Sequence, residues 1–275
     1  MAARTGNSGI LLAGGGFRTG SFQVGVLEAI YRANIDPIYY QGVSVGSLNA
    51  AKLVESGSID ELKEIWTRIE SKGPKRLFSP RRSKKEKLSP YANKNLVKLI
   101  ESLKLALIIS SKKRFDIVTR NESLNQPEIF CNQSPTFASS PETLAKALLA
   151  SISIPGFFDP VQIQNCWYSD GLYCMINPVL DLALDTIFMV TRNRTQSALG
   201  KSRSERAEYP FDHLSDCVME AKISELRSRL TDSKIIVIQP EMEIPTLTFK
   251  SFKKGDISKY IQHGFEKTEK ILSTL

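Results

Sequence analysis

Short apolar segments alternate with amphipathic segments along this chain, and that alternation constrains its fold more than any other feature. The runs that are typical of strands are 9–13, 38–43, 128–132, 161–169, 186–191 and 234–239. Helical patterns cover residues around 22–30, 47 onward, 59–69, 95–109, 140–151, 210–230 and 257–274. Strands that alternate with helices are typical of parallel sheets. We therefore expect an α/β fold of three layers, in which helices flank a mostly parallel central sheet.

The segment 72–114 differs from the rest of the chain in its charge. It contains 14 Lys or Arg and two acids, Glu86 and Glu101, so it carries a net charge of +12, whereas the other residues sum to −4. Its first part is rich in Pro, Ser and Lys, which predicts a long exposed loop, and the helical pattern 95–109 follows. We expect a single domain over 1–275 in which this basic loop and helix are inserted.

Two interpretations of the basic segment 72–114 remain open. One is a solvated loop followed by a core helix. The other is a surface that contacts the anionic head groups of a membrane, to which each nearby Lys or Arg contributes about 1 kcal/mol. We expect no nucleic-acid binding, because the segment has no recognition motif and no interleaved aromatic residues.

Apolar runs and cysteines bear on the location of the protein. The chain has no run of 18 apolar residues, and its first residues, MAARTGNSG, lack the apolar core of a secretory signal. The four cysteines are scattered without metal-binding spacing, at Cys131, Cys166, Cys174 and Cys217. Such cysteines are typical of thiols in a reducing compartment. We expect a cytoplasmic protein that can associate peripherally with membranes, has no signal peptide or transmembrane helix, and needs no metal or cofactor.

A serine flanked by two glycines lies between a predicted strand and a predicted helix, in the stretch QGVSVGSLNA. Gly42 and Gly46 allow close approach of the backbone on either side of Ser44. A serine in such a turn is exposed at the carboxyl edge of the sheet, which is the geometry of a nucleophile elbow. Five-residue matches of this kind also arise by chance, so an ordinary glycine-rich turn is the alternative.

A glycine triplet follows the first predicted strand, in LLAGGGFRTGSF. The backbone N–H groups of Gly14, Gly15 and Gly16 can converge on an anion there. A phosphate-binding P-loop would need a lysine before Ser21, and a dinucleotide fingerprint would need glycine instead of Thr19. The third interpretation is an oxyanion hole, to which Arg18 would add positive charge.

A nucleophilic serine needs a proton acceptor. The two histidines, His213 and His263, fall within or beside helical patterns near the C-terminus, which favours surface or packing roles. Asp170 in NCWYSDGLYC follows a predicted strand and is the other candidate. An Asp-Gly pair between strands is also a frequent signal of a type I′ hairpin turn.

Taken together, these motifs resemble those of the patatin-like phospholipases: GGGFRTG at 14–20, GVSVG at 42–46 and DGL at 170–172. The stretch LASISIPGFF at 149–158 and Asn177-Pro178 also look similar to that family. The chain departs from the family pattern at two positions. Thr19 lengthens the glycine loop by one residue, and Leu172 replaces a small residue.

The resemblance implies a patatin-like fold and a serine lipid acyl hydrolase that cleaves phospholipid or lysophospholipid esters with a Ser–Asp dyad. The residues so implied are Ser44 as nucleophile, Asp170 as proton acceptor, Gly14, Gly15, Gly16 and Arg18 around the oxyanion, and Gly42, Gly46 and Gly171 as motif glycines. No metal is implied. The alternatives are an esterase or acyltransferase on other esters, and a catalytically silent or regulatory lipid-binding module.

Overall fold

The computed structural model describes residues 6–73, 79–80, 89, 91–135, 140–171, 182–192, 203–242 and 255–275, with the backbone alone at 79–80 and 203–215. The strands of the central sheet are β1 (Ser8–Leu12), β2 (Tyr39–Val43), β5 (Arg114–Asn121), β6 (Gln126–Cys131), β7 (Val161–Ile163), β8 (Cys166–Asp170), β9 (Thr186–Val190) and β10 (Lys234–Ile238). The helices are α1 (Gly16–Arg32), α2 (Val45–Ser56), α3 (Ile59–Lys72), α4 (Lys94–Glu101), α5 (Leu105–Ile109), α7 (Pro141–Ser151), α8 (Arg203–Arg229) and α9 (Asp256–Leu272). A short ribbon pairs β3 (Ser79–Pro80) with β4 (Tyr91–Ala92).

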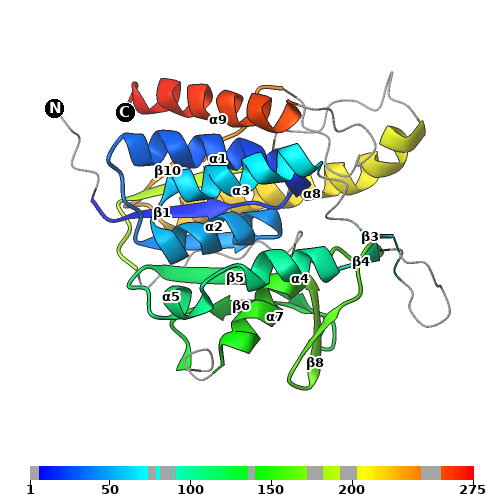
Figure 1. Cartoon of the computed structure of the whole chain (residues 1–275). Helices are drawn as coiled ribbons and strands as arrows, with labels where there is room; N and C mark the ends of the chain where they lie inside the picture. Colours follow the sequence, from blue (N-terminus) through cyan, green and yellow to red (C-terminus); the bar gives the residue numbers. More distant parts are fainter. Residues whose placement is uncertain are drawn as a thin grey trace.

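The central sheet has the order β10-β9-β1-β2-β5-β8-β7, and β6 also pairs with β5. Figure 1 labels β1, β5, β6, β8 and β10 of this sheet. The pairs from β10 to β5 are parallel, whereas β6, β8 and β7 are antiparallel to their neighbours. The predicted α/β class with a mostly parallel sheet is therefore confirmed. Because the carboxyl ends of parallel strands meet at one edge, the loops after β1 and β2 lie side by side there.

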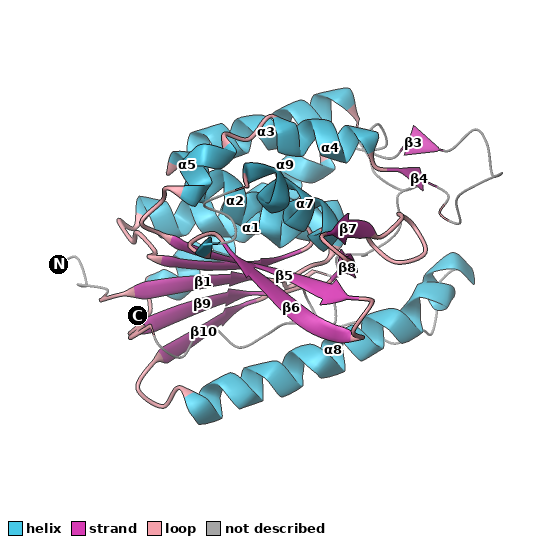
Figure 2. Ribbon diagram, turned by 90° about the horizontal axis from the view of Figure 1, so that it is seen from below, coloured by secondary structure: helices cyan, strands magenta, loops and turns pink. Residues whose placement is uncertain are grey.

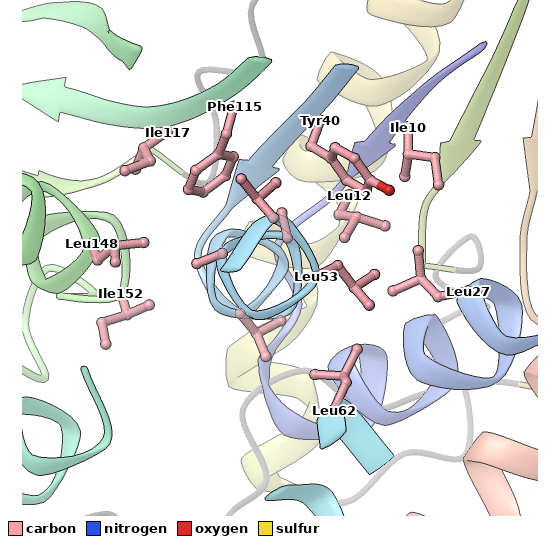
Figure 3. Packing of buried hydrophobic residues seen from close by; sticks show 14 of the residues in the cluster. Ile10, Leu12, Leu27, Tyr40, Leu53, Leu62, Phe115, Ile117, Leu148 and Ile152 are labelled. Atoms are coloured by element: carbon pink, nitrogen blue, oxygen red, sulfur yellow. The ribbon is translucent and has the colours of Figure 1, made fainter. Parts of the chain in front are cut away.

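Side chains along β1 point alternately to the two faces of the sheet, and each face has its own packed core. Ile10 and Leu12 face the layer that contains α1 and α2, whereas Leu11 between them faces the smaller core under α8. Figure 2 shows α8 on one face of the sheet and the other helices on the opposite face. In the larger core, Leu12 packs with Leu53 of α2 and other leucines from the surrounding helices (Figure 3). The strands β1 and β9 are buried on both faces almost throughout, which is why they read as continuous apolar runs.

The C-terminal helix α9 packs against α1, the helix that follows the glycine triplet (Figure 1). Glycines make the close crossing possible, since a Cβ at Gly25 would overlap the carbonyl of Ile261, and one at Gly264 would overlap the carbonyl of Phe22. Glu70 of α3 holds the start of α9 by accepting hydrogen bonds from the backbone of residues 257 and 258, at 3.0 and 3.3 Å. A carboxylate at a helix N-terminus is favourable because of the helix dipole.

The structure corrects two predicted elements. The helical pattern 95–109 is two helices, α4 and α5, because the Ser102 hydroxyl bonds the Leu99 carbonyl at 2.6 Å and Lys104 has non-helical dihedrals. The run 161–169 is not one strand but the hairpin of β7 and β8, whose turn holds Gln164 at a φ of 52°. The central strand β5 was not predicted at all.

Candidate active site

Ser44 lies between β2 and α2 in a backbone conformation that few non-glycine residues adopt, with φ 54° and ψ −127°. Such a residue costs about 1–3 kcal/mol and persists only when its surroundings hold it. A Cβ at Gly42 would overlap the backbone of Ser47, and one at Gly46 would overlap the carbonyl of Leu12. Both glycines are therefore required for the start of α2 to pack against β2 and β1. This is the strand–turn–helix context that a nucleophile elbow needs.

The glycine triplet lies at the same sheet edge as Ser44. Leu12 pairs with Gly42, so Gly14 and Ser44 each follow a paired residue of neighbouring strands by two positions. Gly15 has a φ of 144° and Gly16 a φ of 70°, values that favour glycine strongly. Helix α1 begins at Gly16 and α2 begins directly after Ser44, so two helix N-termini with their N–H groups meet at this edge.

Asp170 ends β8, two strands away from β2 in the sheet. Val43 pairs with Val118 of β5, and the next residue of β5, Thr119, pairs with Asp170. Ser44 and Asp170 therefore flank Thr119 at the same level, one on each side of β5. Asp170 is 4% exposed. Neither it nor Gly171 has a positive φ, so the type I′ turn is excluded. A Cβ at Gly171 would lie 3.0 Å from the backbone of Val118, so close packing rather than backbone conformation favours glycine at this position.

The end of α7 connects the two predicted catalytic positions, and the sequence had assigned it no role. The amide of Ser44 donates to the hydroxyl of Ser151 at 3.0 Å, and that hydroxyl donates to the carbonyl of Val118 at 2.8 Å. Two residues later, the carbonyl of Ser153 accepts the amide of Asp170 at 3.0 Å. Ser151 and Ser153 are fully buried. A single turn of chain therefore fixes the backbone at both Ser44 and Asp170.

A buried polar network lies behind the glycine triplet. The Gln23 amide donates to the carbonyl of Ala13 at 2.6 Å. Asn49 of α2 donates to Gln23 and to the carbonyl of Gly20, both at 3.0 Å, and accepts from the Trp66 indole at 2.9 Å. Gln23 and Asn49 are almost fully buried, so losing a partner would leave a polar group unsatisfied at a cost of about 1–3 kcal/mol. The network joins α1, α2 and α3 to the residue that precedes Gly14.

Arg18 is buried in the first turns of α1. It lies close enough to α9 for its positive charge to affect the pKa of Tyr260. Burial raises the pKa of Tyr260 in α9, while the positive charge of Arg18 acts in the opposite direction. His263 of α9 accepts the amide of Glu241 at 3.1 Å, and its ring lies 5.6 Å from that of Phe22 in the core. The side chain of His213 lies outside the described residues, as do Leu172 and Asn177-Pro178.

Two residues in the middle of the basic segment, Ser89 and Tyr91, contact the chain beside the candidate site. Tyr91 of β4 stacks on Phe157 with ring centroids 6.2 Å apart, and its amide donates to the Phe157 carbonyl at 3.2 Å. The Ser89 hydroxyl bonds Asp159. An open cleft of about 830 Å³ lies here, and its walls include Ser169, the residue before Asp170.

Metal-binding clusters and membrane spans are both absent from the described part of the chain. Within it, no group of three or more His, Cys, Asp or Glu side chains is placed to hold a metal ion. Its helices are too short or too polar to cross a membrane.

The fold and these motifs define a class of enzymes. A sequence model of the patatin-like phospholipases matches residues 10–183, more than half of the chain, so this chain belongs to that family. Membership supports an activity of the lipid acyl hydrolase class. The uncharacterized protein R571 of Acanthamoeba polyphaga mimivirus is 28% identical over 251 residues, with 83% of this chain and 82% of R571 aligned. The crystal structure of VipD from Legionella pneumophila matches 99% of this chain and 68% of VipD with a TM-score of 0.58 at 12% identity, which shows a shared fold.

Proposed function

We propose that this protein hydrolyses acyl esters of phospholipids or lysophospholipids, with Ser44 as the nucleophile and Asp170 as the proton acceptor. The observation that carries the proposal is the register of β2, β5 and β8, in which Ser44 and Asp170 flank Thr119 at the edge where α1 and α2 begin. The strained φ of Ser44 supports it, since strain of this kind is concentrated at functional sites.

In the proposed reaction, the Ser44 hydroxyl attacks the ester carbonyl while Asp170 takes its proton. The oxyanion that forms is stabilised by backbone N–H groups of Gly14, Gly15 and Gly16 and of the first turn of α2, with Arg18 adding positive charge. Asp170 then returns the proton to the leaving alcohol. Water attacks the acyl-enzyme while Asp170 accepts a proton from it, and Asp170 then passes this proton to the Ser44 oxygen as the fatty acid is released, which restores both groups. A carboxylate is a weak base towards an alcohol, so the reaction depends on positioning.

Covalent labelling with a serine-reactive fluorophosphonate tests the proposal. The parent protein should be labelled at Ser44, and Ser44→Ala should be neither labelled nor active on a short soluble ester. Asp170→Asn should lose the same activity while it remains folded. His263→Ala is the control, because His263 contacts Phe22 and Glu241 rather than the candidate site. If His263→Ala were folded but as inactive as Ser44→Ala, the Ser–Asp dyad would be wrong and a triad that includes His263 would replace it.

The same labelling distinguishes the alternatives. A folded parent protein that binds lipid vesicles but neither reacts with the fluorophosphonate nor hydrolyses esters would be a lipid-binding or regulatory module. A labelled protein that cleaves soluble esters but no phospholipid would be an esterase, or an acyltransferase if an added alcohol accepts the acyl group.

We also propose that the basic segment 72–114 contacts anionic membrane beside the site. The contacts of Ser89 and Tyr91 with the chain at 157–159 support this, because they fix the end of the basic loop near Asp170. Four basic residues of the loop, Arg81, Arg82, Lys84 and Lys85, lie outside the described residues. Their joint replacement by Ser should weaken binding to anionic vesicles by up to a few kcal/mol. Co-sedimentation with vesicles at low and high salt measures this. If binding were unchanged, the basic segment would be a solvated loop followed by a core helix instead of a membrane-contacting surface.

A further inference from the structure

Thr19 carries a buried hydroxyl that has no hydrogen-bond partner among the residues that the structure describes. The residue is fully buried in the first turns of α1. Its polar neighbours are paired, since the Ser21 hydroxyl donates to the Arg18 carbonyl at 2.8 Å and the Gln23 amide donates to the Ala13 carbonyl at 2.6 Å. Burying a hydroxyl without a hydrogen bond is unfavourable, and the large majority of buried polar side-chain atoms in proteins are paired.

Packing alone does not explain a threonine at this position. Valine has nearly the same shape and carries a methyl group in place of the hydroxyl, so it would fill the same space without burying a polar group. Thr19 is also the residue that makes the glycine loop one residue longer than the pattern of the patatin-like phospholipases. The hydroxyl, rather than the shape, is therefore what distinguishes this residue.

The Thr19 side chain lies against the glycine triplet. A Cβ on Gly15 would overlap the Thr19 hydroxyl and would lie 2.9 Å from the Thr19 Cβ. The hydroxyl is therefore directly beside the loop backbone at Gly15, where φ is 144°. Gln23 follows Thr19 by four residues on the same face of α1 and bonds the residue before Gly14, so this face of the helix is turned toward the loop.

The same part of α1 also contacts the elbow. A Cβ on Gly20, the residue after Thr19, would overlap the side chain of Val45, the residue after Ser44. Thr19 therefore belongs to the short stretch of α1 that joins the glycine triplet to the elbow. Its burial matches that of the proposed reacting groups, since Ser44 is 5% exposed and Asp170 is 4% exposed.

Two amides of the elbow are already engaged in hydrogen bonds. The Ser44 amide donates to the Ser151 hydroxyl at 3.0 Å, and the Ser47 amide donates to the Ser44 carbonyl at 2.9 Å. Either amide would have to break its bond before it could serve an oxyanion. The Thr19 hydroxyl has no bond to break within the described part of the chain, and donors that are already in place stabilise developing charge most effectively.

We propose that the Thr19 hydroxyl donates a hydrogen bond to the oxyanion of the tetrahedral intermediate, beside the backbone N–H groups of the glycine loop. The inference rests on the proposed function and makes Thr19 a catalytic residue. No proton is transferred, because the hydroxyl keeps its hydrogen and releases the oxygen when the carbonyl re-forms. A bond of this kind is strongest while the oxygen is charged, so it should act on kcat rather than on KM.

Thr19→Val removes the hydroxyl and keeps the shape of the side chain. Its kcat for p-nitrophenyl butyrate should fall by about tenfold or more, with KM unchanged to within about twofold. Thr19→Ser keeps the hydroxyl and should retain most of kcat. Thr19→Val should unfold at the same or a higher urea concentration than the parent, because it loses an unpaired buried hydroxyl.

Thr268→Val is the matched control. Thr268 is also fully buried, but its hydroxyl donates to the Gly264 carbonyl at 2.8 Å within α9. This variant should therefore keep the kcat of the parent. An equal loss of kcat in Thr19→Val and Thr268→Val would overturn the proposal.

Inhibition by an alkyl trifluoromethyl ketone separates contact with the oxyanion from an effect on the position of Ser44. The ketone carbon forms a bond to the serine oxygen, and its carbonyl oxygen becomes the charged oxygen of a tetrahedral adduct. Thr19→Val should weaken this inhibition by about the same factor as it lowers kcat/KM, since the adduct resembles the transition state. The corresponding methyl ketone, which forms the adduct far less readily, should bind both proteins equally.

Three results would overturn the role of Thr19 alone while the parent hydrolyses the ester. They are an unchanged kcat in Thr19→Val, an unchanged inhibition by the trifluoromethyl ketone, and a lowered kcat that comes with unfolding at a lower urea concentration and is not recovered in Thr19→Ser. The last result would make Thr19 a structural residue. A folded parent protein that hydrolyses no ester would instead overturn the proposed function, and the Thr19 hydroxyl would then have no oxyanion to stabilise.

Discussion

The hydroxyl of Ser151 accepts the amide of Ser44 at 3.0 Å and so ties the end of α7 to the strained residue of the elbow. The same hydroxyl donates to the carbonyl of Val118, so one buried oxygen joins α2, α7 and β5. This bond occupies the Ser44 amide, so in the proposed reaction the oxyanion is left to the following N–H groups of α2 and to those of Gly14, Gly15 and Gly16.

Ser151→Ala should therefore lower kcat by roughly tenfold or more, because small displacements of a nucleophile are costly. It should also destabilise the fold by about 1–3 kcal/mol, since it leaves the Ser44 amide unsatisfied. Ester hydrolysis and urea unfolding measure the two effects. Ser151→Thr keeps the hydroxyl and should restore most of kcat. If Ser151→Ala were destabilised with an unchanged kcat, the bond would be purely structural.

Gly15→Ala should reduce kcat by a factor of roughly 10², with a smaller change in KM, because its Cβ would overlap Thr19 and force the N–H groups of the loop to move. Gly57→Ala is a matched control. Gly57 also has a positive φ, of 64°, but a Cβ added there would meet nothing within 4 Å. That control should lose about 1 kcal/mol of stability and keep its kcat. Equal losses of kcat in Gly15→Ala and Gly57→Ala would show that the glycine loop has no specific role in catalysis.

Gln23→Leu should lower kcat through the backbone of the glycine triplet rather than through a contact with the substrate. The C=O and N–H of one planar trans peptide point in opposite directions, so the bond from Gln23 to the Ala13 carbonyl also fixes the direction of the Gly14 N–H. Loss of that bond should lower kcat by about tenfold and leave KM near the parent value. Gln262→Leu, which removes an exposed bond to Glu266, should change neither. A rise in KM at constant kcat would show that Gln23 serves substrate binding instead.

Asp116 should make stability depend on pH. Burial raises its pKa, against the opposing effects of the Arg114 charge and the Tyr39 hydrogen bond. As pH rises above about 4, the unfolded state releases this proton first, so the contribution of Asp116 to stability declines until its folded pKa is passed. Asp116→Asn cannot lose a proton. Its free energy of unfolding, relative to the parent, should therefore increase between pH 4 and pH 8. Urea unfolding at both values measures this, and a constant difference would contradict it.

The alternation of apolar and amphipathic segments was enough to predict the fold class, and the GVSVG motif was enough to predict the strand–turn–helix around Ser44. The strand β5 was hidden because Arg114 and Asp116 interrupt its apolar pattern, although Asp116 is fully buried. Its burial depends on Tyr39, which is 77 residues away in sequence and donates to it at 3.0 Å. The role of Ser151 could not be predicted for the same reason. The stretch 149–158 resembles the family, but the role of Ser151 depends on a hydrogen bond with Ser44, 107 positions earlier in the sequence.

The close crossing of α1 and α9 has a consequence for anyone who shortens or tags this chain. The family match ends at residue 183, so a version trimmed to that boundary would retain every proposed catalytic residue. It would nevertheless remove α9 from its contact with α1, the helix that begins at Gly16 of the glycine triplet, and expose Gly25 and its neighbours to water. A tag at the C-terminus is tolerable, since the last residue is exposed, but a stop codon before α9 should yield an insoluble product.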